Sequence, residues 1–255
     1  MYELLLFGTG IVTGVMNAIA GGGGLLTFPI LLASGMPALS ANATNNIAVF
    51  PGQIASIYSY RKYLRRIPKR YTLLAVPCLI GAVIGAVILR NTASDNFEKL
   101  VPGLIAFAVV MFIFQPFLHQ HLNLSLHGPK RQRNRWQSLF LLSMAMMPIS
   151  IYGGYFGAGF GFIMLAFLGF TKLNHMHEIN ALKNLMSICT LVGSIIVLYG
   201  SGFINWRVGL TMALGNLIGG YYGAQVAQKT GSHIIRIVII VIGVVTATYL
   251  GFKTY

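Results

Sequence analysis

The chain has 255 residues and a formal net charge of +14, yet only 9% of its residues are charged and 56% are hydrophobic. A soluble domain carries about 25% charged residues, whereas the mean hydropathy here is +0.73. These values exclude an ordinary soluble domain and predict an all-α, polytopic protein whose surroundings are the lipid bilayer. The basic residues lie in loops between apolar segments, which is typical of cytoplasmic loops, so we expect no nucleic-acid partner.

Apolar segments recur along the whole chain. In order they are 4–20, 25–34, 41–60, 71–89, 100–118, 136–154, 160–170, 176–200, 205–227 and 233–252. A helix that crosses the membrane needs about 20 residues, because the hydrocarbon core is about 30 Å thick. Segments 25–34 and 160–170 have about half that length. They are therefore expected to be half-helices of re-entrant hairpins, or the second parts of broken spans.

A glycine cluster precedes each of the two short segments. The first cluster is Gly21, Gly22, Gly23 and Gly24, and the second contains Gly157, Gly159 and Gly161. Glycine costs about 1 kcal/mol per helical residue relative to alanine, so each cluster should break its helix. The next helix then begins with unpaired N–H groups, which bind anions. Two such breaks at corresponding places of two halves indicate a transporter's substrate site.

The two halves of the chain match at a constant spacing. Gly22 matches Gly159 and Ala43 matches Ala181, so the offset is 137 or 138 residues. Further matches are Gly24 with Gly161, Asn46 with Asn184, Ser56 with Ser194, Arg70 with Arg207, Gly81 with Gly219 and Gly85 with Gly223. We interpret the chain as a first membrane repeat, a basic cytoplasmic linker and a second membrane repeat, at 1–118, 119–135 and 136–255.

Loop charges predict how the two repeats are oriented. Loop 61–70 and linker 119–135 are rich in Lys and Arg and should be cytoplasmic, whereas loop 90–99 mixes both signs and should lie outside. In the second repeat the basic residues move to the turn 229–236. This difference favours inverted repeats, each with one glycine-broken re-entrant pair and three transmembrane helices, and with both termini outside. A parallel arrangement with four crossings per half is the alternative.

Polar residues follow each glycine cluster. Asn45 and Asn46 lie in the first repeat, and Lys183 and Asn184 lie in the second. Lys183 either binds an anion or extends to the headgroups, and the asparagines either donate to an oxyanion or bridge helices. Tyr155 adjoins the second cluster and is a further candidate, although aromatic residues also gather at membrane interfaces.

Several residue classes restrict the function. All acidic residues lie near segment ends, at Glu3, Asp95, Glu98 and Glu178, so the cargo is expected to be anionic. We interpret Cys78 and Cys189 as core residues and the histidines, His119, His121, His127, His175 and His177, as loop residues, and we expect no metal site and no cofactor. No catalytic constellation appears, so the protein is not expected to be an enzyme. Close helix packing explains the small residues Gly81, Gly85, Gly219 and Gly223.

The two glycine motifs resemble those of a known family. Residues 21–29, Gly-Gly-Gly-Gly-Leu-Leu-Thr-Phe-Pro, followed by Ala43-Thr44-Asn45, resemble the first-half signature of the sulfite exporter TauE/SafE family. Residues 153–161 and 181–184 are similar to its second-half signature. The resemblance implies a multi-pass inner-membrane transporter of sulfite, thiosulfate, sulfonates or related organic acids. It implies a substrate role for the matching positions Gly22, Gly24, Asn45, Gly159, Gly161 and Asn184.

The sequence thus predicts an anion bound between the two breaks and moved by alternating access, and the family resemblance implies that this anion is small and contains sulfur. The candidate substrate-binding residues are Gly21, Gly22, Gly23, Gly24, Asn45, Asn46, Tyr155, Gly157, Gly159, Gly161, Lys183 and Asn184. An anion channel on the same scaffold and a non-transporting membrane assembly partner are the alternatives. Small residues on several spans permit a homodimer. The anion, its direction and any coupling ion stay open.

Overall fold

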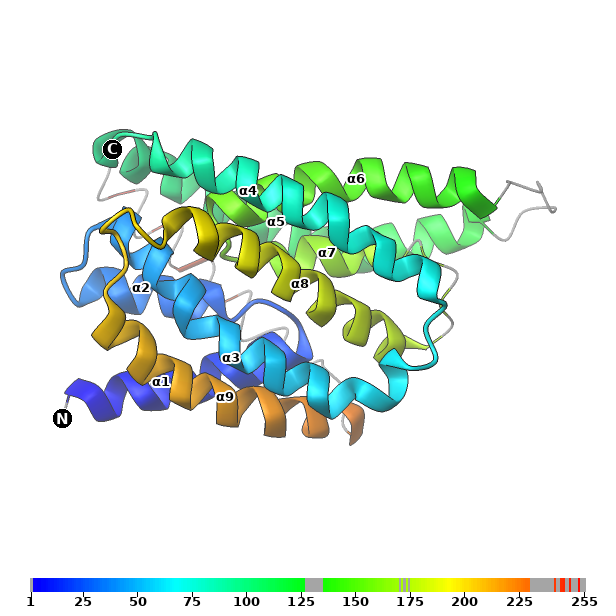
Figure 1. Cartoon of the computed structure of the whole chain (residues 1–255), viewed down its shortest axis with the longest axis horizontal. Helices are drawn as coiled ribbons and strands as arrows, with labels where there is room; N and C mark the ends of the chain where they lie inside the picture. The colour runs from blue at the N-terminus through cyan, green and yellow to red at the C-terminus, as the bar shows by residue number, and fades with distance from the viewer. Residues whose placement is uncertain are drawn as a thin grey trace.

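The computed structural model describes residues 2–126, 135–169, 171, 173, 175–229, 241, 244, 245, 248 and 252, with side chains except at 112 and 114–138. All regular structure in these residues is helical (Figure 1). The elements are α1 Tyr2–Ile19, α2 Gly24–Ala33, α3 Ala38–Leu64, the 3-10 helix η1 Lys69–Leu74, α4 Ala75–Arg90, α5 Ser94–Leu126, α6 Arg135–Tyr155, α7 Phe160–Leu168, α8 Met176–Leu198 and α9 Trp206–Lys229.

These helices confirm the predicted all-α class, and they coincide with nine of the expected apolar segments. Within the described residues, three helical stretches are long and apolar enough to cross a membrane: Tyr2–Ile19, Lys69–Arg90 and Met176–Leu198. The expected segment 233–252 lies largely outside the described residues. Within the expected linker 119–135, residues 119–126 instead continue helix α5 and residue 135 begins α6, while residues 127–134 lie outside the described part of the chain.

Both glycine clusters interrupt the helix as expected. Gly21 has φ 88°, a left-handed conformation that cannot continue a right-handed helix, so α1 ends before it. Gly157 and Gly159 have φ 71° and φ 76° and separate α6 from α7 in the same way. The helices that follow the breaks, α2 and α7, have 10 and 9 residues. At about 1.5 Å per residue each reaches only half of a bilayer core.

The α1–α2 and α6–α7 hairpins enter the bundle from opposite ends. Tyr2, at the start of α1, lines the same pocket as Ser34, which follows α2. The α6–α7 hairpin starts at the other end (Figure 1) and leads into α8, where the His177 ring lies 4.9 Å from that of Tyr63, beside loop 61–70. Both glycine breaks are therefore hairpin tips that point into the molecule.

The longer helices pack in a reciprocal order. Helix α1 packs on α9, α9 on α3, α3 on α8, α8 on α4, and α4 on α6. Exchanging α1 with α6, α3 with α8 and α4 with α9 reproduces the same order in reverse. The two halves are thus interleaved, because each half supplies helices that pack on the other half.

Glycines permit the closest of these contacts. A β-carbon placed on Gly81 of α4 would lie 2.6 Å from the Met147 carbonyl oxygen of α6. One placed on Gly219 of α9 would overlap the Ile11 carbonyl of α1. The close packing expected for Gly81, Gly85, Gly219 and Gly223 is confirmed, since each β-carbon position meets backbone of a neighbouring helix.

Gly81→Ala is expected to destabilise the fold by about 1–3 kcal/mol, because the added methyl forces α4 away from α6. Gly103→Ala in α5 is the matched control, since nothing lies within 4 Å of its β-carbon position. Thermal unfolding in detergent should show a lower midpoint for Gly81→Ala and an unchanged or higher one for the control. Equal midpoints would contradict the close α4–α6 packing.

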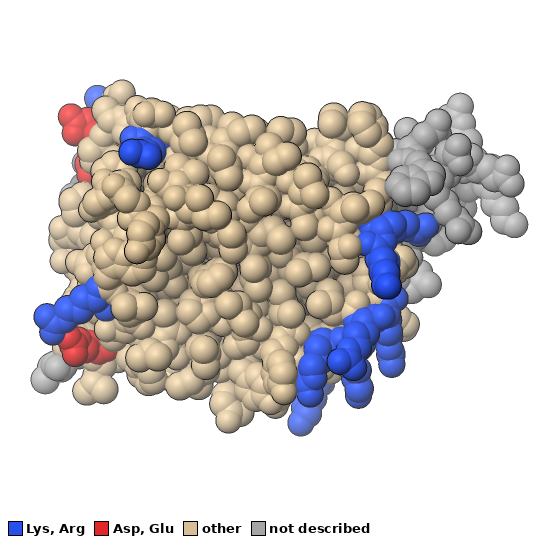
Figure 2. Space-filling view, viewed as in Figure 1, with Lys and Arg blue, Asp and Glu red and all other residues tan. Residues whose placement is uncertain are grey.

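Charged side chains divide between the two ends of the molecule. Figure 2 shows Lys and Arg side chains gathered at one end, where loop 61–70 lies, and acidic side chains at the other. Gln228, near the end of α9, donates a hydrogen bond of 3.5 Å to the Ser59 carbonyl and so places Lys229 at the first end. We call this the basic end. The opposite, mixed-charge end carries Glu3, Arg90, Asp95, Glu98, Lys99 and Arg207.

Candidate functional site

The tips of the two hairpins touch each other. A β-carbon placed on Gly21 would lie 2.9 Å from the α-carbon of Gly161, and one placed on Gly161 would overlap the Gly21 carbonyl oxygen. Gly21 also has a φ of 88°, which residues with side chains rarely adopt. Only glycine fits both positions. The two clusters, far apart in sequence, therefore meet at one place in the fold.

The other glycines of the first cluster also meet the second half. Gly22 faces the ring of Phe162. A β-carbon placed on Gly24 would lie 3.1 Å from the Ala158 α-carbon and 3.3 Å from Asn45 Nδ2. The first residue of α2 thus lies between the second hairpin tip and helix α3.

Asn17, near the end of α1, links the first tip to α8. Its Oδ1 accepts a hydrogen bond of 2.8 Å from the Gly23 N–H, and its backbone carbonyl accepts one of 2.7 Å from Lys183 Nζ. An amide oxygen at a helix N-terminus satisfies the same donors that bind an anion. The Asn17 side chain is therefore a neutral cap for the start of α2, and the Lys183 ammonium is bound to the same residue.

The glycines of the second cluster have different surroundings. A β-carbon placed on Gly157 would lie 3.2 Å from Asn46 Oδ1. One placed on Gly159 would meet the side chains of Ala108 and Leu25, which are apolar. Of these two predicted site residues, Gly157 adjoins the polar side chains of α3 and Gly159 packs towards α5.

Helices α3 and α8 each carry a stripe of buried polar side chains. The stripes are Asn42, Asn45 and Asn46 on α3 and Asn180, Lys183, Asn184 and Ser187 on α8, and each residue is at most 5% exposed. Spacings of three and four residues place such side chains on one helix face. Helices α3 and α8 pack against each other, and we call the two stripes the walls of the candidate site. They differ in charge, because an offset of 138 residues places Lys183 opposite neutral Asn45.

Lys183 is 0% exposed, although it is a charged residue. Its ammonium does not extend to the headgroups but donates to the Asn17 carbonyl inside the protein. None of the four acidic side chains pairs with it; within the described residues the ion pair is Arg207 with Glu3. Burying a cation without a counter-ion costs free energy. Such a residue inside a membrane protein therefore indicates a functional site.

Many polar atoms of Asn17 and of the two walls lack a hydrogen-bond partner among the described residues. They are Asn17 Nδ2, Asn42 Oδ1, Asn45 Oδ1, Asn180 Oδ1, Asn184 Oδ1 and Nδ2, and Ser187 Oγ. Buried polar groups are paired in the great majority of cases. Their concentration on both walls indicates a place for a polar ligand or ordered water.

Tyr155 takes part through its backbone. Its carbonyl accepts a hydrogen bond of 2.9 Å from Asn42 Nδ2, and its ring packs edge-on against Phe97, with centroids 5.6 Å apart. The side chain is half-buried. In the structure, Tyr155 therefore makes a backbone contact between α6 and α3.

Sequence reasoning missed four polar residues of this group: Asn17, Asn42, Asn180 and Ser187. A signal existed for two of them, because Asn42 and Asn180 are 138 residues apart and each precedes a candidate residue by three positions. For Asn17 the signal was weaker, namely one amide in an apolar helix.

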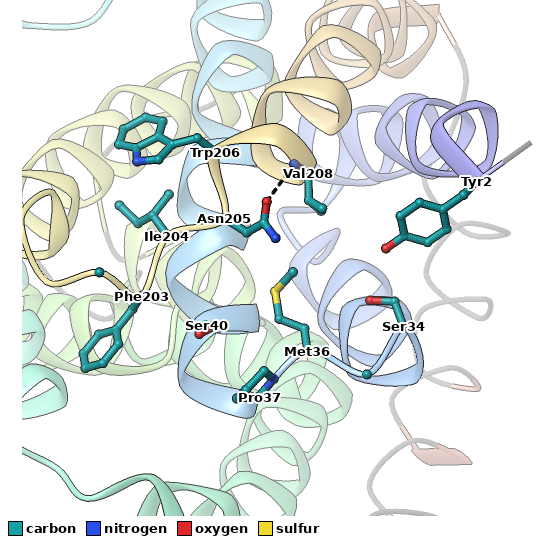
Figure 3. A pocket seen from close by; sticks show the side chains of 12 residues that line it. Tyr2, Ser34, Met36, Pro37, Ser40, Phe203, Ile204, Asn205, Trp206 and Val208 are labelled. Carbon is teal, nitrogen blue, oxygen red and sulfur yellow. Dashed lines mark hydrogen bonds between the residues drawn. The ribbon is translucent and has the colours of Figure 1, made fainter.

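A pocket opens at the mixed-charge end (Figure 3). Its volume is about 670 Å³, within the range of about 300–1,000 Å³ for ligand pockets. The connections α2–α3 and α8–α9 and the start of α1 line it, with Met36, Phe203 and Trp206 among the apolar side chains. The Asn205 N–H donates a hydrogen bond of 2.9 Å to Thr44 Oγ1, and Thr44 precedes Asn45. One wall of this pocket, which we call the end pocket, is thus hydrogen-bonded to the residue that precedes Asn45 in α3.

The described residues contain no group of three or more His, Cys, Asp or Glu side chains that would hold a metal ion. The side chains of His119 and His121, and the whole of His127, lie outside the described part of the chain. The sequence-based expectation of no metal and no cofactor stays a prediction.

The chain matches proteins of one class. The family model described as Sulfite exporter TauE/SafE matches residues 6–250. A probable membrane transporter protein of Haemophilus influenzae is 30% identical over 243 residues, covering 93% of this chain and 89% of the relative. The probable membrane transporter protein YfcA of Escherichia coli K12 is 27% identical, covering 98% and 90%. No solved structure matches.

The helical architecture and these relatives define a multi-pass membrane transporter. The chain belongs to the sulfite exporter TauE/SafE family, because the family model spans nearly its whole length. The family resemblance drawn from the two glycine motifs is confirmed.

Proposed function

We propose that this transporter carries a small sulfur-containing anion, such as sulfite, thiosulfate or a sulfonate, bound between the two glycine breaks. The observation that carries the proposal is the contact of Gly21 with Gly161 beside Lys183, a fully buried cation without an acidic partner. An anion supplies the missing counter-charge, and the unpaired amides on both walls supply its hydrogen bonds. The matching family is described as a sulfite exporter.

The proposed architecture consists of two inverted repeats, 1–118 and 136–255, joined by the linker 119–135. The reciprocal helix order and the entry of the two hairpins from opposite ends support it. Each repeat then has one re-entrant hairpin and three crossings. In this proposal the basic end lies in the cytoplasm and both termini lie outside, as the positive-inside bias favours. The family resemblance favours a cell inner membrane.

Alternating access in this arrangement opens the site to one end at a time. The candidate residues on α3 and α8 are closed to solvent, which is the expected condition of an occluded state. The end pocket is the proposed approach from outside, because Asn205 in its wall is hydrogen-bonded to Thr44, which precedes Asn45 in α3. Rocking one repeat against the other separates these contacts.

Sulfite, thiosulfate and simple sulfonates should raise the unfolding temperature of the purified protein, whereas choline should not. A ligand at about 100 times its Kd stabilises by about 2.7 kcal/mol. Gly24→Leu should abolish the shift, because its side chain enters the space beside Ala158 and Asn45. Gly103→Leu in α5, where the β-carbon position is open, is the matched control.

Reconstituted vesicles separate a transporter from the alternatives. Uptake should saturate and should be stimulated by substrate on the opposite side, which a channel does not show. No ligand-dependent shift with any anion, together with no flux, would contradict the proposal and favour an assembly partner.

A further inference from the structure

The candidate site offers one formal positive charge. Lys183 is its cation, and Asn45 stands at the matching position of the other repeat. The acidic side chains leave that charge uncompensated, because Glu3 pairs with Arg207 and none pairs with Lys183. A monoanion neutralises one buried cation. A dianion would leave a second charge buried without a partner, which is strongly unfavourable.

Two unpaired amide atoms in the site have orientations set by other hydrogen bonds. Asn17 Oδ1 accepts from the Gly23 N–H, so the unpaired Asn17 Nδ2 is a donor. Asn42 Nδ2 donates to the Tyr155 carbonyl, so the unpaired Asn42 Oδ1 is an acceptor. The donor lies beside the first hairpin tip, on the residue that holds Lys183. The acceptor lies beside the second tip, 4.0 Å from a β-carbon placed on Gly157.

This arrangement has two chemical poles. Lys183 Nζ and Asn17 Nδ2 suit the oxygens of an anionic group. Asn42 Oδ1 accepts only, and Asn42 is 0% exposed, so it requires a ligand or water that donates a hydrogen bond. A fully deprotonated sulfite, sulfate or thiosulfate has no such donor.

We propose that the preferred substrate is a singly charged oxyanion that carries its own hydrogen-bond donor, such as a hydroxyalkanesulfonate or hydrogensulfite. The inference rests on the proposed function, because it assigns the charge and polarity of the anion bound at that same site. The oxyanion lies against Lys183 and Asn17, and the donor group lies against Asn42.

Three sulfonates of similar size test both parts. Hydroxyethanesulfonate has one charge and a donor, ethanesulfonate has one charge and no donor, and sulfoacetate has two charges. Isothermal titration of the full-length protein in detergent should give a Kd for hydroxyethanesulfonate at least about tenfold lower than for either of the others.

The Asn42→Leu variant tests whether Asn42 Oδ1 accepts the hydrogen bond from the donor group of the substrate. The variant should bring the affinities for hydroxyethanesulfonate and ethanesulfonate to within about threefold of each other, because the acceptor is gone. Asn216→Leu is the matched control, since Asn216 is also 0% exposed but lies in α9 against Gly52. It should preserve the wild-type preference. If Asn42→Leu does not fold, the ratios of the three Kd values measured on the wild-type protein decide whether the inference holds.

The outcomes separate this inference from the proposed function. Tighter binding of sulfoacetate than of hydroxyethanesulfonate, or equal binding of the two monoanions, would overturn the inference. If Gly24→Leu then abolished the binding that was observed, the proposed site between the glycine breaks would still stand. Binding of none of the three, with no shift for any other anion, would overturn both.

Discussion

The Gly161→Ala variant is expected to lose anion uptake and to unfold at a lower temperature than the wild type. Its β-carbon would overlap the Gly21 carbonyl oxygen, which is backbone and cannot rotate away. Overpacking of this kind costs about 1–3 kcal/mol. Uptake should suffer more than stability, because the methyl separates the two hairpin tips on which the site depends.

Gly21→Ala should have a larger effect still. The added side chain meets Gly161 and also has to adopt φ 88°, and a left-handed conformation costs roughly 1–2 kcal/mol more for a residue with a β-carbon. Gly8→Ala in α1 is the control, since its β-carbon position is open. Vesicle uptake and thermal unfolding are the measurements. Wild-type uptake by Gly161→Ala would show that the tips do not form the site.

The Lys183→Met variant is expected to lose uptake by about 100-fold or more while its fold stays as stable as the wild type. Methionine fills a similar volume without the charge, so the several kcal/mol needed to bury an ammonium are no longer required. The change leaves the Asn17 carbonyl without its partner, which costs about 1–3 kcal/mol. The two effects oppose each other.

This separation of uptake from stability distinguishes three roles for Lys183. A substrate contact predicts lost uptake with normal thermal unfolding, whereas a structural bond to α1 predicts a lower unfolding temperature. A lysine that only extends to the headgroups predicts little change in either. Thr190→Ala, a buried position further along α8, is the control for substitutions in this helix. Normal uptake by Lys183→Met would contradict the anion-site proposal.

Local chemistry made the breaks and the half-helices predictable. Glycine runs at 21–24 and 157–161 interrupt helices through backbone conformation, which depends on adjacent residues alone. Segment lengths then follow from hydropathy, so the short helices α2 and α7 begin within one residue of the predicted positions. The duplicated spacing gave the correspondence of Asn45 with Lys183.

Side-chain partners were less accessible to sequence reasoning. Gly159 matched the family motif, yet it packs on Ala108 and Leu25. Tyr155 was a candidate because it adjoins the second cluster, and its backbone carbonyl makes the contact with Asn42. Asn17 was overlooked, although it joins the α2 N-terminus to Lys183. Each of these contacts depends on how one helix is rotated against another, and the amino-acid sequence does not specify that rotation locally.

The sequence by itself determined the membrane class, the family, the order of the helices and the two breaks, because composition, hydropathy and glycine conformation are local properties. Only the tertiary structure decided that the hairpins enter from opposite ends and that Gly21 meets Gly161. It also decided that the Lys183 ammonium turns inwards to Asn17. The last two features depend on contacts between residues more than 130 positions apart, which follow from the packing of whole helices.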